Sequence, residues 1–308
     1  MAVTAALVKE LREITGAGMM DCKKALVETD GDVEKAIEIL REKGLSKAAK
    51  KSDRIAAMGL VRIAFAEDHK SAALVEVNSE TDFVAKNEDF VTFVEKIAQI
   101  ALENDAADVE ALKALPYDAE KTVGEELTNK IATIGENLTI RRFVKYAEPG
   151  VVYSGYTHTN GMIGVIVGLE TEATADEIAV VGKDVAMQVA SMNPKFLDDT
   201  QVDQEWLASE TEIAKHQLLN EGKKEELLDR IIPGKIKAIL KEVCLVDQKF
   251  VKNGDLTVAE YVAEVAKEVG KDMKVASMVR YEVGEGIEKK EEDFAAEVAA
   301  QQAAAAQK

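Results

Sequence analysis

The same order of patterns occurs twice along this chain, and this repetition constrains the fold more than any other feature. Each copy begins with two extended apolar stretches, the pattern of a β-hairpin, and continues into an amphipathic helix. In the first copy these elements are Gly59–Phe65, Ala72–Val77 and a helix from about Glu88; in the second they are Val151–Thr157, Met162–Leu169 and a helix from about Asp176 to Met192.

A third strand is predicted near the end of each copy. Leu138–Tyr146 is β-rich, and Val279-Arg280-Tyr281 in the second copy echoes Val144-Lys145-Tyr146 in the first. The sequence therefore predicts an internal duplication of the α+β class. Each half is a small antiparallel sheet covered by helices on one face, because helices can bury the apolar side of alternating strands.

Local signals divide the chain further. Asn87 is positioned to cap the helix that begins at Glu88, and Asn160-Gly161 suits a type I′ turn in the second hairpin, where Gly161 supplies the positive φ. The predicted domains are residues 1–54, an amino-terminal domain of three short helices with a linker; 55–147, the first half of the core; 148–282, the second half; and 283–308, a carboxyl-terminal helical module.

The amino-terminal domain shows three runs of apolar residues at helical spacing between about Thr4 and Arg54. Gly16 and Gly18 interrupt the first run, and Gly44 is expected to cap the third helix at its carboxyl end. The polar, basic stretch Leu45–Arg54 is expected to be a helical or flexible linker.

A helical insertion is predicted inside the second half, from about residue 203 to 243. Its apolar residues fall on stripes, and Gly222 marks the turn between two helices. Such a seam needs a partner surface, so the insertion is an antiparallel coiled hairpin, a homodimer contact, or both. The self-packed hairpin is the favoured interpretation.

Charge and composition restrict the partners. The 308 residues include 39 Lys and Arg against 57 Asp and Glu, a net charge of -18, which repels phosphate backbones and anionic lipids. Charged residues interrupt the first 13 positions, and no run of about 18 apolar residues occurs after them, so neither a signal peptide nor a membrane span is expected. Cys22 and Cys244 have no companion ligands at metal-binding spacing and are expected to be reduced core thiols in the cytoplasm.

No catalytic constellation is evident. The three histidines, His69, His158 and His216, are scattered over two turns and one helix. There is no phosphate-binding glycine loop, since Gly284-Glu285-Gly286 is acidic and comes after a strand instead of opening a helix. We therefore expect no cofactor, no bound metal, no nucleotide site and no enzymatic activity.

Two stretches are unusual. Leu11–Leu26 carries Met19 and Met20 beside a glycine turn; both fill the bundle core, or at least one is an adaptable partner contact. Glu76–Lys86 leaves a strand and carries Phe83 in a polar turn, where the ring either tucks under the next helix or stays exposed. Taken alone, each stretch favours the buried alternative.

These two stretches resemble the signature motifs of the elongation factor Ts family, the nucleotide exchange factors of elongation factor Tu. Further landmarks occur in the family's order, namely Ile134-Gly135-Glu136-Asn137 with Ile140-Arg141-Arg142, Val243-Cys244-Leu245 and Gly284-Glu285-Gly286-Ile287-Glu288. The resemblance covers nearly the whole chain. It implies a ubiquitin-associated-like amino-terminal bundle, a duplicated core, an inserted coiled-coil hairpin and a short carboxyl-terminal helical module.

The resemblance also implies site residues. Thr81, Asp82, Phe83 and Val84 correspond to the segment that the family uses to dislodge magnesium from the GTPase, which then releases GDP and later binds GTP. Leu11, Arg12, Met19, Met20, Gln188 and Phe294 are the implied partner contacts. Some relatives have a histidine where this chain has Gln188, and a glutamine cannot become charged.

Two other classes of function remain open at this point. A ubiquitin-associated-like module on a duplicated α+β scaffold also suits a peptide-binding adaptor or chaperone. An enzyme on paired α+β domains would need a pocket with convergent titratable groups, which the sequence does not show. Release of GDP from elongation factor Tu distinguishes the exchange factor from both.

Overall fold

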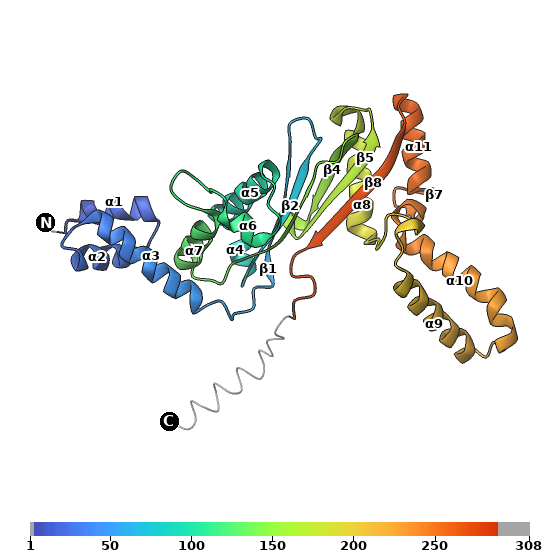
Figure 1. Ribbon diagram of the computed structural model, residues 1–308, viewed down its shortest axis with the longest axis horizontal. Helices are drawn as coiled ribbons and strands as arrows, with labels where there is room; N and C mark the ends of the chain where they lie inside the picture. The colour runs from blue at the N-terminus through green and yellow to red at the C-terminus, as the bar shows by residue number, and fades with distance from the viewer. Residues whose placement is uncertain (1–2, 289–308) are drawn as a thin grey trace, which may run out of the picture.

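The computed structural model describes residues 3–288 and is elongated (Figure 1), with a helical domain at one end, sheets in the middle and a helical hairpin projecting at the other end. Within these residues there are eleven α-helices and eight strands, the latter in two three-stranded sheets and one two-stranded sheet. The predicted mixture of helices and small antiparallel sheets is thus present. No helix of residues 3–288 is both long and apolar enough to cross a bilayer.

The amino-terminal domain consists of α1 (Ala5–Thr15), α2 (Met19–Glu28) and α3 (Val33–Ala49). The Thr4 side chain accepts from the backbone of Leu7 and caps α1, and the Asp32 side chain caps α3 in the same way. The small core of this domain contains Val8, Leu11, Cys22, Ala25, Leu26 and Ala36.

The prediction that Gly44 caps α3 is wrong, because the helix continues to Ala49. Gly44 is buried inside the helix, where a β-carbon would lie 3.6 Å from the Ala132 β-carbon of α7 (Val123–Ile134). Gly44 therefore lies where α3 packs against α7, and the segment expected to be a helical or flexible linker is helical as far as Ala49.

The first half of the core contains β1 (Met58–Phe65), β2 (Ala72–Ser79) and β3 (Thr139–Tyr146), which pair antiparallel in that order. Its helices are α4 (Asp82–Ala85), α5 (Glu88–Glu103), α6 (Val109–Ala114) and α7. Asn87 accepts from the backbone of Asp89 and Phe90, so the predicted cap of α5 is confirmed.

The second half repeats this sheet with β4 (Val151–His158), β5 (Ile163–Thr171) and β8 (Met273–Glu282), again antiparallel in that order. Helices α8 (Ala175–Met192) and α11 (Val258–Val269) cover it, and β6 (Lys249–Phe250) pairs with β7 (Asn253–Thr257) beside them. Short 3-10 turns occupy Asp199–Gln201, Glu225–Leu227 and Leu245–Asp247.

The type I′ turn predicted at Asn160-Gly161 is wrong. His158 pairs with Ile163, and a 3-10 turn over Thr159–Gly161 connects the strands, with positive φ at Thr159, Asn160 and Gly161. Gly161 does have the positive φ that was expected. A β-carbon on Gly161 would also lie 2.2 Å from the flexible end of the Arg62 side chain, 3.0 Å from Leu60 Cδ2 and 3.3 Å from the Val61 carbonyl oxygen, so this turn packs closely against β1.

The two large sheets face each other, an arrangement that periodicity did not predict. Along β2, alternate side chains pack against α5 on one face and against the second sheet on the other, so the whole strand is buried. The interface between the sheets contains Val61, Leu74, Tyr153 and Ile166. The core therefore has four layers, helix, sheet, sheet and helix (Figure 1).

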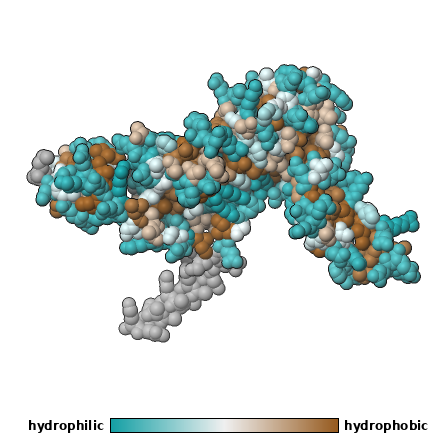
Figure 2. All heavy atoms as spheres, in the orientation of Figure 1, coloured by the Kyte–Doolittle hydropathy of each residue, from teal (hydrophilic) through white to brown (hydrophobic). Residues whose placement is uncertain are grey.

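The inserted hairpin consists of α9 (Gln204–Asn220) and α10 (Leu228–Val243), which contact each other and project from the second half (Figure 1). Few of its residues are fully buried, namely Ala214, Leu218 and Leu228. Hydrophobic residues occur along its length on the surface (Figure 2), and Ile213, Leu219 and Leu227 are exposed. Coiled-coil packing and a homodimer contact stay predictions.

Candidate functional site

Among residues 3–288, Phe83 is the most exposed of the large apolar side chains, at 79%. It lies in the single turn of α4, directly after β2, and its neighbours Val84 and Ala85 are buried. The alternative in which Phe83 tucks under α5 is wrong. Val84 and Ala85 instead anchor the turn in the core, which leaves the ring of Phe83 pointing away from it.

The backbone before Phe83 is fixed by a single carboxylate. Glu136, which lies just after α7, accepts from the Thr81 backbone nitrogen at 3.0 Å and from the Thr81 hydroxyl at 2.6 Å. The Ser79 hydroxyl donates to the Thr81 carbonyl at 2.9 Å. Thr81 is therefore held through its backbone nitrogen, its carbonyl and its side chain, and Phe83 projects from a turn with a defined start.

A second set of contacts supports the first. The Glu80 carboxylate accepts from the Asn137 backbone nitrogen at 2.6 Å, and the Asn137 side-chain nitrogen donates to the Arg54 carbonyl at 2.7 Å. Arg54 in turn pairs with Glu80 at 3.4 Å. The turn before Phe83, the segment after α7 and the linker from α3 thus meet at one end of the first sheet.

The residues that hold the Phe83 turn lie in stretches that the sequence analysis singled out, but it assigned them no role. Glu136 and Asn137 belong to the Ile134-Gly135-Glu136-Asn137 landmark, and Glu80 lies within the Phe83 stretch itself. Glu80 and Asn137, which form a hydrogen bond, are 57 residues apart in the chain, and no local sequence pattern predicts a contact over that separation.

Asp82 and Lys86 form an exposed pair on α4. Lys86 Nζ donates to Asp82 Oδ2 at 2.6 Å, and this hydrogen bond lowers the pKa of the Asp82 carboxyl group. The same ammonium lies 6.0 Å from the centroid of the Phe83 ring. Asp82 is therefore a carboxylate at neutral pH, and its first partner is within its own turn.

Met19 and Met20 are 47% and 63% exposed, so the prediction that both fill the bundle core is wrong. They open α2 directly after the Gly16–Gly18 turn, which places them at the surface. Arg12 is exposed on the preceding helix, whereas Leu11 is fully buried and can only support this surface from inside.

Gln188 does not reach the surface. It is fully buried in α8, where its amide nitrogen donates to Gln248 Oε1 and to the Lys249 carbonyl, each at 3.1 Å. Its amide oxygen accepts from the Val251 backbone nitrogen at 2.8 Å. The hydrogen-bonding capacity of Gln188 is used to attach the β6–β7 segment to α8, so a direct partner contact at this position is not available in this structure.

The sequence-predicted residues are thus distributed over the molecule. Thr81, Asp82, Phe83 and Val84 form one site, and Arg12, Met19 and Met20 lie in the separate amino-terminal domain (Figure 1). Phe294 lies outside the described residues. Within residues 3–288, no three His, Cys, Asp or Glu side chains converge as metal ligands. Cys22 and Cys244 are buried, and burial raises the pKa of the Cys244 thiol to about 11.

Comparison with known proteins is consistent across the chain. The family model described as Elongation factor TS matches residues 80–285. A protein named Elongation factor Ts from Clostridioides difficile (strain 630) is 55% identical over 299 residues, which covers 97% of this chain and 98% of that protein. Proteins of the same name from Clostridium botulinum (strain Eklund 17B / Type B) and Clostridium perfringens (strain 13 / Type A) are 52% and 53% identical, over 97% and 96% of this chain and 99% and 98% of their own lengths. The chain therefore belongs to the elongation factor Ts family.

Proposed function

We propose that the chain is a guanine-nucleotide exchange factor of translation elongation, which binds elongation factor Tu carrying GDP, promotes release of magnesium and GDP, and is displaced when GTP binds. Family membership supports this function. The observation that carries it is Phe83, a large apolar ring held 79% exposed on a turn with a fixed backbone. A largely exposed ring on a fixed support suits insertion into another protein.

In physical terms, a GTPase retains its nucleotide through backbone donors around the phosphates and a magnesium ion that bridges phosphate oxygens to the protein. The Phe83 ring inserts between helices of the partner and shifts the elements that support the ion. Asp82, paired with Lys86, orients the turn. Loss of the ion leaves the phosphate charge unbalanced, and GDP dissociates without any covalent step.

Exchange then results from thermodynamic linkage. The factor binds the nucleotide-free GTPase more tightly than the nucleotide-bound GTPase, so each ligand weakens the binding of the other. The same coupling allows GTP to displace the factor. The chain itself needs neither a nucleotide site nor a metal for this cycle.

We further propose that residues 1–54 dock on the nucleotide domain of the partner through Met19, Met20 and Arg12. Methionine side chains adapt to an opposing surface, and both are exposed here. Residues 55–147 and 148–282 form the two core halves, and the module from 283 to 308 adds a contact near Phe294. A factor with this role acts in the cytoplasm.

The test is release of labelled GDP from purified elongation factor Tu, with and without the full chain. We expect the chain to accelerate release strongly at substoichiometric amounts, since it leaves the partner once GTP binds. A release rate that the chain does not change would contradict the proposed function.

A further inference from the structure

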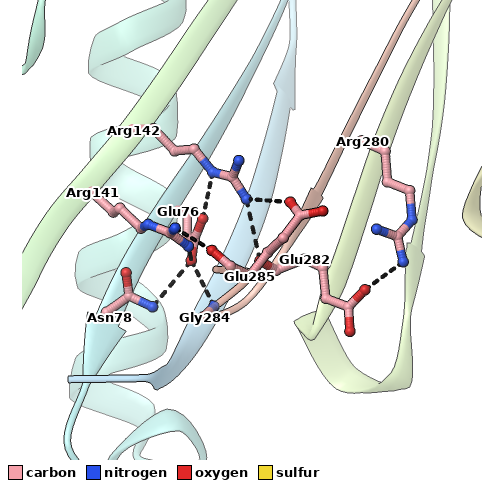
Figure 3. Close-up of polar contacts among 8 residues, drawn as sticks. All are labelled: Glu76, Asn78, Arg141, Arg142, Arg280, Glu282, Gly284 and Glu285. Atoms are coloured by element: carbon pink, nitrogen blue, oxygen red, sulfur yellow. Dashed lines mark hydrogen bonds and ion pairs between the residues drawn. The ribbon is translucent and has the colours of Figure 1, made fainter. Parts of the chain in front are cut away.

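A fully buried carboxylate lies at the centre of a polar cluster in the first sheet (Figure 3). The side chain of Glu76 on β2 accepts from Arg141 Nη1 at 3.0 Å, Arg142 Nε at 2.6 Å, Asn78 Nδ2 at 3.1 Å and the Gly284 backbone nitrogen at 2.9 Å. Burial alone would raise the pKa of the Glu76 carboxyl group, but these donors outweigh burial and lower it. Glu76 is therefore an ionised, fully coordinated group, which we call the Glu76 centre.

The Glu76 centre lies at a bulge between β2 and β3. Glu76 pairs with Arg142 and Val77 with Ile140, so Arg141 is the extra residue. A bulge bends its strand and redirects the residues on either side of it. Beyond it, β2 leads within a few residues to Glu80 and Thr81, and β3 starts shortly after Glu136 and Asn137. The bulge therefore sets the relative placement of the two segments that fix the Phe83 turn.

The same centre holds the turn at the end of β8. Gly284 has a φ of +72°, and a β-carbon there would lie 2.2 Å from the Ala57 carbonyl oxygen, so only glycine fits. Arg142 Nη2 donates to the Glu282 carbonyl at 3.2 Å and to Glu285 Oε2 at 3.1 Å, and Arg141 donates to the Glu285 carbonyl (Figure 3). The two arginines thus bind Glu76 on one side and the 282–285 turn on the other.

We propose that the Glu76 centre is a positioning site for nucleotide release, which uses the 282–285 turn to fix the bulge and thereby the Phe83 turn. The proposal rests on the proposed function. It makes Glu76, Arg141 and Arg142 positioning residues, since none of them needs to touch the partner. It also means that a displacement of the chain beyond Gly284 is transmitted to Phe83 through β2.

The test compares two glycines in the same turn. Gly284→Ala forces the turn away from Ala57, while Gly286→Ala introduces an alanine at a similar φ of +74° with no atom within 4 Å. We expect Gly284→Ala to slow stimulated GDP release by about fivefold or more, a typical coupling between sites. Gly286→Ala should release GDP close to the parent rate. Equal rates for the two variants would overturn the proposal.

A double-mutant cycle separates positioning from simple loss of stability. A smaller folded fraction would lower the rate by the same factor with or without Phe83. If the centre acts through Phe83, the Gly284→Ala deficit should largely disappear when Phe83→Ala is already present. Deficits that multiply independently would overturn the proposal, although the parent chain would still stimulate release and the proposed function would stand.

A surface variant keeps the test decisive if Gly284→Ala does not fold. Glu285 is half-exposed, and Glu285→Ala removes only its pair with Arg142. We expect about a twofold slower release, since exposed pairs are weak, and again no deficit in the Phe83→Ala background. A Glu285→Ala chain that matches the parent in every background would overturn the proposal.

Discussion

At the scale of single residues, Phe83 is exposed, so it should contribute little to the stability of the fold and is available for contact with a partner. Sequence patterns alone favoured a buried ring, because a large apolar side chain is usually worth burying. The structure shows why this one is not: Val84 and Ala85 already occupy the core side of the turn, and Glu136 fixes the backbone before it. The burial of Val84 and Ala85, more than the hydrophobicity of Phe83 itself, accounts for the exposed position of the ring.

Phe83→Ala should therefore unfold nearly like the parent. An exposed position changes the free energy of unfolding by no more than about 0.5 kcal/mol, whereas a buried Phe would cost about 3–5 kcal/mol. The variant should still bind elongation factor Tu but release GDP markedly more slowly, with a smaller deficit when EDTA has removed magnesium. Thermal unfolding and GDP release measure both. Joint loss of stability and binding, with no effect of EDTA, would refute the insertion mechanism.

Glu76 makes the stability of the chain sensitive to acid. Its pKa is lower in the folded chain than its ordinary value of 4.5, so its contribution is present above that value and is lost as the pH falls through the folded pKa. At neutral pH, Glu76→Gln should cost about 1.5–3 kcal/mol.

The difference in the free energy of unfolding between parent and Glu76→Gln should shrink as the pH falls below the ordinary value of 4.5 and through the lower pKa of the folded chain. Urea unfolding at several pH values measures it. Glu170→Gln is the control, because Glu170 is an exposed partner of Lys274 and its removal should cost little at any pH. A gap that stays constant with pH would mean that the pKa of Glu76 is the same in the folded and the unfolded chain.

At the scale of elements, local patterns predicted most of the helices and strands. Strand alternation and helix caps involve residues a few positions apart, which is why both hairpins, α5 with its Asn87 cap, and the helices of the insertion were recognisable. The errors at Gly44 and Asn160-Gly161 share one cause. In both places a glycine that resembles a local signal lies against a distant element, Gly44 beside Ala132 of α7 and Gly161 against β1.

The α9–α10 hairpin is an element whose removal should leave exchange intact. Its base must stay, because Phe196 packs against Trp206 with ring centroids 5.1 Å apart, and Lys195 lies over the Trp206 ring. Replacing residues 211–237 by a short Gly-containing turn should preserve most of the stimulated GDP release at equal concentrations. An intact but inactive variant would show that the hairpin contacts the partner.

The same variant tests self-association. Exposed Ile213 and Leu227 would be lost with the outer hairpin, so any homodimer that depends on them should become a monomer. Sedimentation of the parent and the variant side by side measures this. A parent that is already monomeric would leave the hairpin without a role as a dimer contact.

At the scale of the whole molecule, the sequence indicated two similar halves but not how they meet. The face-to-face stack of sheets depends on residues far apart, such as Leu74 and Tyr153, and on glycines whose role is visible only in three dimensions. The Glu76 centre was missed for the same reason, since its contact with Gly284 spans 208 positions. The repeated sequence pattern predicts the two halves, but the contacts between the halves follow no sequence periodicity and could not be predicted from it.

Gly164 tests the closeness of the two sheets. A β-carbon at this position of β5 would lie 2.5 Å from Val61 Cγ1 and 2.9 Å from Leu74 Cδ1, both in the opposite sheet. Gly164→Ala should therefore destabilise the chain by about 1–3 kcal/mol through overpacking. Gly254→Ala is the control, because no atom lies within 4 Å of its β-carbon. Equal unfolding midpoints in urea would show that the sheets do not approach this closely.

The strand order of the two sheets has a consequence for biosynthesis. Synthesis proceeds from the amino terminus and domains tend to fold in that order. The first sheet has all its strands once Tyr146 has been made, whereas β5 waits for β8 until the nascent chain has passed Met273. During this interval the growing polypeptide carries a finished first sheet whose Glu76 has Arg141 and Arg142 but not yet Gly284. We expect the Phe83 turn to reach its final geometry only when translation of this chain is nearly complete.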